Sequence, residues 1–238
     1  MNRTTTVVFV GPTLAAAEAR ALLPGADVRG PVAVGDVLRL RRVARIAIVD
    51  GYFERMAAVW HKEILFALAA RTAVYGASSM GALRAAELAP FGMVGVGAIA
   101  RDFRRGTLVD DDEVAVAHLP ADSGYAAVST AMVDLRAGLA RARRAGAITA
   151  ADEARLIALG KARFYRERTW EQLVDDARAA RLPRRALAGL TAHGPVAQKA
   201  ADARALLRLL ARTPERRPPR PRWTFSRTWF WNAFTQLA

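Results

Sequence analysis

The amino-acid sequence predicts an α/β fold, with a small parallel sheet flanked by helices in the N-terminal half and a helical C-terminal part. Two observations support this prediction. Short apolar runs alternate with helical patterns over residues 1–90, which is typical of a parallel sheet covered by helices. Beyond residue 126 the apolar side chains recur every three or four positions, which is typical of amphipathic helices.

The first half of the chain supplies the elements of the predicted sheet. Turn signals such as Gly-Pro and Asp-Gly separate the apolar runs from the helical patterns. Because ligands bind beyond the carboxyl ends of parallel strands, the turns after these strands should converge on one edge of the sheet. The expected strands cover residues 6–10, the neighbourhood of Val28, 45–50 and 72–75, and the expected helices cover 13–23, 34–40, 60–70 and 79–88.

The second half of the chain is predicted to be mainly helical. A short helix and an acidic loop come first, and Thr149 is then placed to cap a helix. The Thr-x-x-Gln pattern that begins at Thr169 is typical of a capping box and starts another helix. The expected helices cover residues 99–105, 126–144, 150–161, 169–181 and 195–211.

Proline and arginine mark a boundary near the end of the sequence. Residues 213–222 contain four prolines among arginines, a composition that favours an extended linker. We therefore expect three parts, namely an α/β core at residues 1–125, a helical region packed on it at 126–212, and a linker with an aromatic tail at 213–238.

The composition excludes some kinds of chemistry. The chain has no cysteine, so disulfides, thiolate metal sites and a cysteine nucleophile are excluded. No apolar run reaches the length of a membrane span, and we expect a cytoplasmic protein. The net charge of +14 fits either an acidic partner or arginine-rich solvated helix faces, and we predict neither a nucleic-acid nor a membrane partner.

The sequence Gly-Ala-Ser-Ser-Met-Gly at residues 76–81 lies between a predicted strand and a predicted helix. This arrangement resembles the turn that exposes a nucleophilic serine in hydrolases, with Ser79 as the candidate nucleophile. Backbone N–H groups at the helix start would stabilise an oxyanion, or bind an anionic group beside Ser78. The alternative is that Ser78 or Ser79 only caps the helix.

A serine nucleophile needs a base, and the chain has three histidines. His61 is the best placed, because it begins the helix that follows the strand ending at Asp50. The edge of the sheet would then bring Asp50, His61 and Ser79 into a triad-like arrangement. Lys62 is an alternative base or a ligand for an anion.

The acidic segment at residues 110–113 offers oxygen ligands, but no metal-loop spacing accompanies it. We favour a polar turn that caps a following element or orients Arg84, or else a surface that recognises a peptide through Asp112 and Glu113, and we predict no metal. Arg84 and Glu87 are three residues apart on one predicted helix, so they share a face that is suited to binding substrate.

Six aromatic residues gather within twelve positions of the tail, more than an exposed peptide should carry. We expect this segment to pack against its own chain, with docking on a partner protein or a membrane surface as the alternatives. The residues are Trp223, Phe225, Trp229, Phe230, Trp231 and Phe234.

Four segments, taken in order, resemble the TfuA family. They are Asp-Gly-Tyr-Phe at residues 50–53, Val-Trp-His-Lys-Glu-Ile at 59–64, the serine turn and helix at 76–88, and Asp-Asp-Asp-Glu-Val-Ala-Val at 110–116. The resemblance is close over residues 46–125 and looser around 164–170 and 198–199. So long an ordered series of motifs is far more specific than the serine turn alone.

The resemblance implies a role beside YcaO enzymes, which activate a peptide amide with ATP and, in this setting, replace its oxygen with sulfur. It implies that this chain helps deliver sulfide during the biosynthesis of such peptides (RiPP biosynthesis). The candidate donor is a ubiquitin-like sulfur carrier protein with a C-terminal thiocarboxylate, and the precursor peptide is a further candidate partner. The YcaO enzyme would hold the ATP, so no cofactor is expected here.

These implications give the candidate residues specific roles. Ser79 would attack the thioacyl carbon with His61 as base, or His61 would activate water directly. Arg84 and Lys62 would hold the carrier tail or the charged sulfur. The alternatives are a non-catalytic docking partner that activates the YcaO enzyme, and an unrelated serine esterase with a deep apolar pocket.

Overall fold

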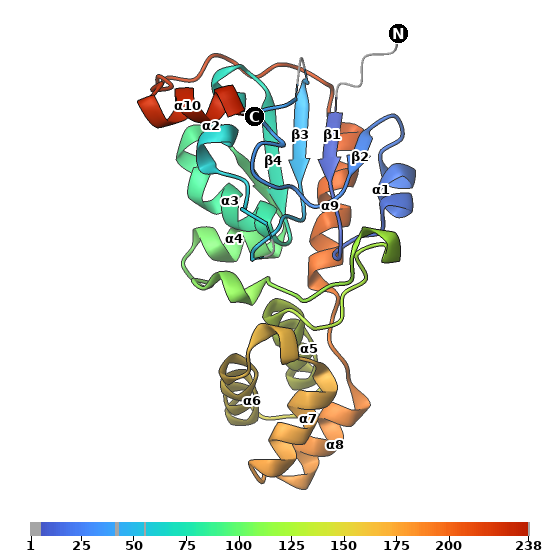
Figure 1. The fold of residues 1–238 in the computed structure, drawn as a ribbon. Coiled ribbons are helices and arrows are strands. Elements are labelled where there is room, and N and C mark those ends of the chain that lie inside the picture. Colours follow the sequence, from blue (N-terminus) through green and yellow to red (C-terminus); the bar gives the residue numbers. More distant parts are fainter. Residues whose placement is uncertain (1–5, 41–42, 55, 238) are drawn as a thin grey trace. The chain divides into compact units, whose positions relative to one another are not determined.

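The computed structural model describes residues 6–40, 43–54 and 56–237 and confirms the predicted α/β fold (Figure 1). The described residues contain one five-stranded parallel sheet in the order β2-β1-β3-β4-β5. The strands are β1 (Thr6–Phe9), β2 (Asp27–Arg29), β3 (Arg45–Ile48), β4 (Ala73–Ala77) and β5 (Val94–Val96).

The chain forms two compact units. The sheet unit contains the described residues up to Leu108 and those from Ala200 onward, and the helical unit contains Val109–Lys199. The domain boundaries expected from the sequence, at residues 125 and 212, stay predictions. No helix in the described part of the chain is both long enough and apolar enough to cross a membrane.

Helices cover both faces of the sheet (Figure 1). Alternate residues of β1 point to opposite faces, so Val7 and Phe9 pack in one cluster while Val8 packs in the other. The first cluster includes residues of α2 and α3, and the second includes residues of α1 and α9. The helices of this unit are α1 (Ala16–Leu22), α2 (His61–Ala69), α3 (Met80–Leu88), α4 (Ala98–Arg104), α9 (Gln198–Arg212) and α10 (Trp229–Leu237).

The helical unit has its own apolar core, to which Leu139, Leu156 and Leu173 contribute. The predicted N-caps are confirmed, since the hydroxyl of Thr149 accepts the N–H of Asp152 and that of Thr169 accepts the N–H of Gln172. The full capping box predicted at Thr169 does not form, because the Gln172 side chain donates to Asp176. Its α-helices are α5 (Met132–Arg144), α6 (Ala150–Ala162), α7 (Trp170–Ala179) and α8 (Arg184–Ala192).

Some predicted elements are wrong, and some observed elements were not predicted. Residues 34–40 form turns and not a helix, because Gly35 has a left-handed φ of 86° and the Glu63 carboxylate accepts its backbone N–H at 2.8 Å. Helix α5 begins at Met132, six residues later than expected. Strand β5 and helix α8 were not predicted, and a glycine-rich sequence hid β5.

Candidate functional site

The turns after β1, β3 and β4 meet at one edge of the sheet, as the sequence predicts. The Asp50 carboxylate accepts the backbone N–H of Gly11 at 2.8 Å and that of Thr13 at 3.1 Å, and also the Thr13 hydroxyl at 2.5 Å. The backbone N–H of Gly81, in α3, reaches the carbonyl of Val49 at 3.2 Å. Asp50 is buried, and its role here is to fix the turn after β1.

The serine turn is a tight connection between β4 and α3. A Cβ on Gly76 would lie 1.9 Å from the carbonyl oxygen of Gly81, and a Cβ on Gly81 would lie 1.7 Å from that of Ile48. Only glycine fits at these two positions. Ser78 has a left-handed φ of 68°, which is uncommon for a serine, and its side chain is buried together with that of Ser79.

The structure revises the interpretation of both serines. Ser79 occupies the N-cap position of α3, but its side chain makes no capping hydrogen bond, so capping is wrong for this residue. The strained backbone of the turn belongs to Ser78, whereas the sequence match placed the nucleophile at Ser79. No signal in the sequence distinguishes the two, because the difference lies in a single backbone angle.

His61 is held by a carboxylate that the sequence did not assign to it. Its Nε2 lies 2.7 Å from Oε2 of Glu87, and the Arg84 guanidinium donates to the same oxygen at 2.8 Å. Arg84 also donates to the carbonyl of Val59 at 3.2 Å, which fixes it beside the start of α2. These contacts join α2 to α3 through one cluster, in which the side chains of His61 and Glu87 are exposed and that of Arg84 is mostly buried.

The hydrogen-bonded triad predicted from the sequence does not form. Among the described residues His61 makes no hydrogen bond to Asp50 or Ser79, because Asp50 serves Gly11 and Thr13 while His61 pairs with Glu87. The catalytic roles of these three residues therefore stay predictions that need a different geometry.

The protonation state of Glu87 determines which nitrogen of His61 can act as a base. Burial raises the pKa of the Glu87 carboxyl, but hydrogen bonds from His61 and Arg84 outweigh this and hold its pKa below the ordinary value. An ionised carboxylate only accepts hydrogen bonds, so Nε2 of His61 must carry the proton. In the neutral form of the imidazole Nδ1 then holds the lone pair, on a side chain that is 48% exposed.

Lys62 directly follows His61 in the first turn of α2. Its Nζ is 3.3 Å from the Thr228 hydroxyl and 5.4 Å from the centre of the Phe225 ring. The Glu63 carboxylate accepts the backbone N–H of Trp60 at 3.2 Å, which fixes the start of the helix. Burial raises the pKa of Glu63, although backbone N–H groups donate to it.

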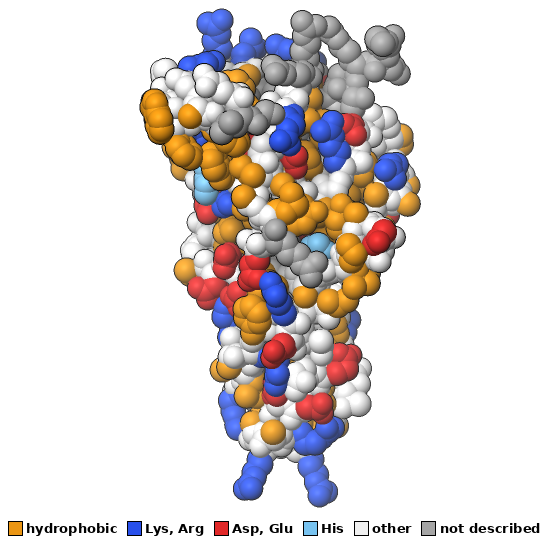
Figure 2. All heavy atoms as spheres, viewed as in Figure 1, with side chains coloured by type: hydrophobic (Ala, Val, Ile, Leu, Met, Phe, Trp, Pro, Cys, Tyr) orange, Lys and Arg blue, Asp and Glu red, His pale blue; other side chains and the backbone are white. Residues whose placement is uncertain are grey.

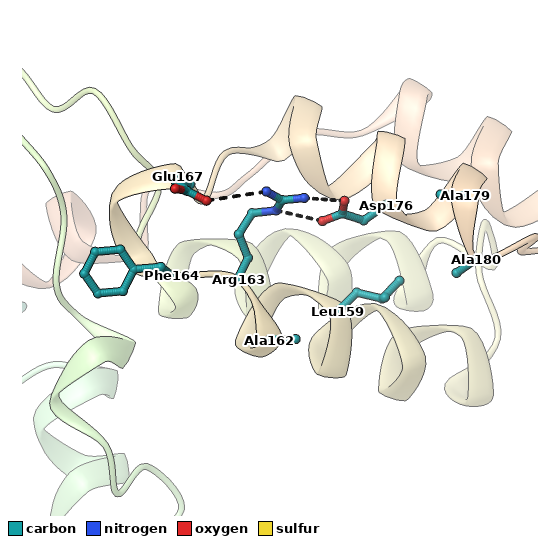
Figure 3. Close-up of a pocket in the computed structure, with 8 residues that line it drawn as sticks. All are labelled: Leu159, Ala162, Arg163, Phe164, Glu167, Asp176, Ala179 and Ala180. Atoms are coloured by element: carbon teal, nitrogen blue, oxygen red, sulfur yellow. Dashed lines mark hydrogen bonds and ion pairs between the residues drawn. The ribbon is translucent and has the colours of Figure 1, made fainter.

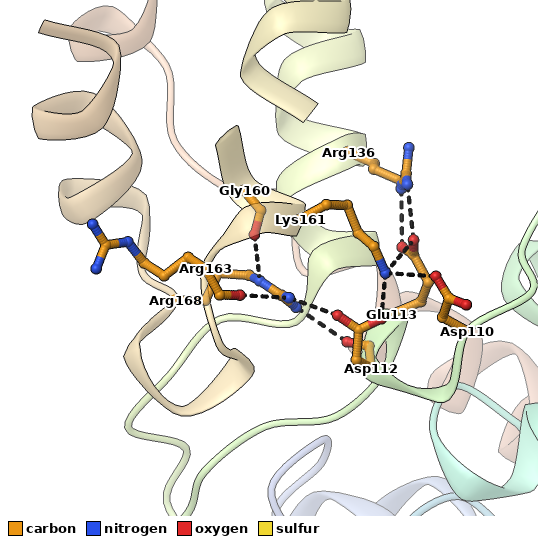
Figure 4. A network of polar contacts seen from close by, with 8 residues as sticks. All are labelled: Asp110, Asp112, Glu113, Arg136, Gly160, Lys161, Arg163 and Arg168. Atoms are coloured by element: carbon orange, nitrogen blue, oxygen red, sulfur yellow. Dashed lines mark hydrogen bonds and ion pairs between the residues drawn. The ribbon is translucent and has the colours of Figure 1, made fainter. Parts of the chain in front are cut away.

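The acidic segment is neutralised within the helical unit (Figure 4). Lys161 contacts Asp110 at 2.9 Å and also Asp112, and Arg168 donates to Asp112 at 2.7 Å. Arg136 donates to both oxygens of Glu113 at 2.8 and 2.9 Å. Oxygens of the three acidic residues lie close enough for a cation, but three basic side chains already satisfy them. The substrate-binding roles of Asp112 and Glu113 stay predictions.

This network makes the stability of the folded chain depend on pH. Burial raises the pKa of Asp112, but hydrogen bonds from Lys161 and Arg168 outweigh it and hold the pKa below the ordinary 3.8. A carboxyl whose pKa is lowered by folding stabilises the folded chain above that ordinary value, and this contribution is lost as the pH falls through the folded pKa.

We therefore expect Asp112→Asn to reduce the free energy of unfolding at neutral pH, with a smaller difference from the unchanged chain in strong acid. Urea unfolding over a pH series measures it, and Asp122→Asn, at an exposed position, is the control. A difference that does not shrink on acidification contradicts this account.

A pocket of about 490 Å³ lies in the helical unit, between α6 and α7 (Figure 3). Arg163 lines this pocket. Its guanidinium donates to both oxygens of Asp176 at 2.5 and 2.9 Å and lies 3.8 Å from Glu167. The charged groups of this pocket satisfy one another, and the described residues that line it include no histidine that could act as a base.

A comparison with protein families identifies the chain. A family model described as TfuA-like protein matches residues 50–169, which is half of the chain. No curated protein matches it. The match contains Asp50, the His61 cluster, the serine turn and the acidic segment. The chain therefore belongs to the TfuA family.

Proposed function

We propose that this chain releases sulfide from a thiocarboxylated, ubiquitin-like sulfur carrier and supplies it to a YcaO enzyme, which converts a peptide amide to a thioamide. Membership of the TfuA family supports the setting. The observation that carries the chemistry is the cluster of His61, Glu87 and Arg84, with Lys62 one residue further along α2.

The geometry favours activation of water by His61. Nδ1 of His61 takes a proton from water, whose oxygen forms a bond to the thioacyl carbon. The carbon–sulfur bond then breaks, the proton passes from His61 to sulfur, and hydrosulfide leaves while the carrier keeps a carboxyl group. The intermediate is more negative than the thiocarboxylate, so the nearby cations Lys62 and Arg84 would stabilise it.

Glu87 is a positioning residue in this scheme. Its carboxylate holds the proton of His61 on Nε2 and thereby leaves Nδ1 as the base. Glu87→Gln would weaken this control, so it should shift the pH dependence of sulfide release as well as lower the rate.

Sulfide release from the purified carrier thiocarboxylate tests the proposal. We expect His61→Ala to lower kcat by roughly 10²- to 10⁴-fold, the usual contribution of a general base. His193→Ala is the matched control, because His193 lies in the helical unit and contacts the carbonyl of Gly189. Ser79→Ala and Ser78→Ala separate the routes, since loss of activity in either one means a serine nucleophile.

The second candidate is a non-catalytic docking partner that activates the YcaO enzyme or presents the carrier or the peptide. Trp229 and Phe230, which are 82% and 59% exposed, favour some protein contact. If the unchanged chain releases no sulfide yet still stimulates the YcaO enzyme, hydrolysis is rejected and this candidate stands.

A further inference from the structure

The segment that contains α10 carries strong positive charge without internal compensation. Residues 216–238 contain five arginines and no Asp or Glu. None of these arginine side chains forms an ion pair with another described residue. They are Arg216, Arg217, Arg220, Arg222 and Arg227. This charge is available to an acidic partner.

Helix α10 is fixed to α2 by aromatic packing. Trp231 is only 1% exposed, and its ring lies 5.3 Å from that of Phe66. The ring of Trp60, at the start of α2, lies 4.4 Å from that of Phe234 and 5.5 Å from that of Phe230. These rings hold the apolar face of α10 against its own unit, as the sequence predicts.

Two aromatic and two arginine side chains at the start of α10 and in the residues before it are exposed. Figure 2 shows hydrophobic side chains gathered over α10. Trp229 and Phe230 are exposed at the start of α10, and Arg222 and Arg227 are exposed in the residues before it. We call these four residues the aromatic–arginine surface. Tryptophan and arginine are the residue types that most often dominate the binding energy of protein interfaces.

The aromatic–arginine surface adjoins the candidate site. Phe230 packs against Trp60, the residue directly before His61. Lys62, directly after His61, contacts Thr228, the residue directly before Trp229. A protein bound to this surface therefore lies beside the base that would act on its tail.

We propose that the aromatic–arginine surface docks the acidic protein whose C-terminal thiocarboxylate is delivered to His61. The identity of this partner as the sulfur carrier rests on the proposed function. The unpaired arginines select an acidic protein surface, and Trp229 and Phe230 fill apolar depressions on it.

Other occupants fit the surface less well. A membrane-bound helix inserts its apolar face into lipid, but this face of α10 is packed on α2. A second copy of the chain would bring two sets of unpaired arginines together, and like charges oppose such contact.

Direct binding of the carrier in its unmodified carboxylate form, followed by fluorescence anisotropy with the full chain, tests the inference. The double variant Trp229→Ala with Phe230→Ala should weaken binding at least about tenfold. Arg222→Glu with Arg227→Glu should weaken it about tenfold at low salt and less at high salt, because salt screens exposed charges.

Matched controls remove similar groups elsewhere. Phe164→Ala removes an exposed aromatic ring, and Arg20→Glu with Arg144→Glu makes the same change in net charge at exposed positions. The controls should bind as the unchanged chain does. Equal binding by the aromatic–arginine variants, or no binding by the unchanged chain, overturns the inference.

The other occupants are tested with the same variants. If the unchanged chain binds phosphatidylserine-containing vesicles but not the carrier, and the aromatic–arginine variants do not bind the vesicles, the surface binds lipid. Self-association in sedimentation experiments, lost in the same variants, would assign it to a second copy. Either result overturns the inference.

Sulfide release is measured separately, with thioacetate as a small thiocarboxylate that needs no docking surface. If neither thioacetate nor the thiocarboxylated carrier yields sulfide but the variants lose carrier binding, hydrolysis fails and docking stands. If sulfide is released and the variants bind normally, docking alone fails.

Discussion

Gly81→Ala is expected to destabilise the folded chain by about 4 kcal/mol or more. A Cβ at this position would lie 1.7 Å from the backbone oxygen of Ile48 and 3.3 Å from Cα of Gly76. Neither atom belongs to a flexible side chain, so α3 would have to move away from the sheet. The hydrogen bond from Gly81 to Val49 would break in the process. Urea unfolding followed by tryptophan fluorescence measures the loss.

Gly194→Ala is the control for this substitution. A Cβ at Gly194 would meet nothing within 4 Å, so the change should stay within about 0.5 kcal/mol. If Gly81→Ala unfolds at the same urea concentration as the unchanged chain, the close contact between α3 and the sheet edge does not exist. The geometry of the serine turn would then need revision.

Arg168→Met is expected to destabilise the helical unit by about 3–5 kcal/mol. The guanidinium is 1% exposed and donates to the carbonyl oxygens of Gly160, Arg163 and Asp112, and to the Asp112 carboxylate. A methionine fills similar volume but leaves these buried acceptors without donors. Unfolding of the full chain in guanidinium chloride, followed by circular dichroism, measures the effect.

Two further variants separate charge from geometry at this position. Arg168→Lys keeps the charge but loses the planar set of donors, so most of the loss should remain. Arg178→Met removes an exposed pair with Asp175, in which both side chains are more than 60% exposed, and should cost less than about 1 kcal/mol. If Arg168→Met is no more destabilising than Arg178→Met, the network of Figure 4 does not stabilise the unit.

The sequence predicts those elements whose pattern is local. The apolar runs that became β1 and β3 are buried along their whole length, and the caps at Thr149 and Thr169 depend on residues three positions apart. Residues 34–40 have a helical pattern of apolar residues, but a carboxylate from Glu63 decides their structure. A contact so distant in sequence is invisible to local patterns.

The candidate site could be predicted only in part, because some of its contacts join residues that are distant in sequence. Strand order places Asp50 and the serine turn at one edge, and this follows from the alternation of strands and helices. The partner of His61 does not follow, because Glu87 is 26 residues away and the sequence pattern assigns it, with Arg84, to a face suited to binding substrate. The three-residue spacing of Arg84 and Glu87 does place them on one face of α3, where they form an ion pair.

The discontinuity of the sheet unit affects how the chain can fold during synthesis. Leu206, Leu207 and Leu210 of α9 belong to the cluster that covers Val8 and Val49. A nascent chain that ends before residue 200 lacks these leucines, so the face of its sheet that α1 covers only in part stays open to water. The helical unit, by contrast, is contiguous and has its own core. During synthesis, therefore, the helical unit has all of its residues before the sheet unit does, although the sheet unit begins earlier in the sequence.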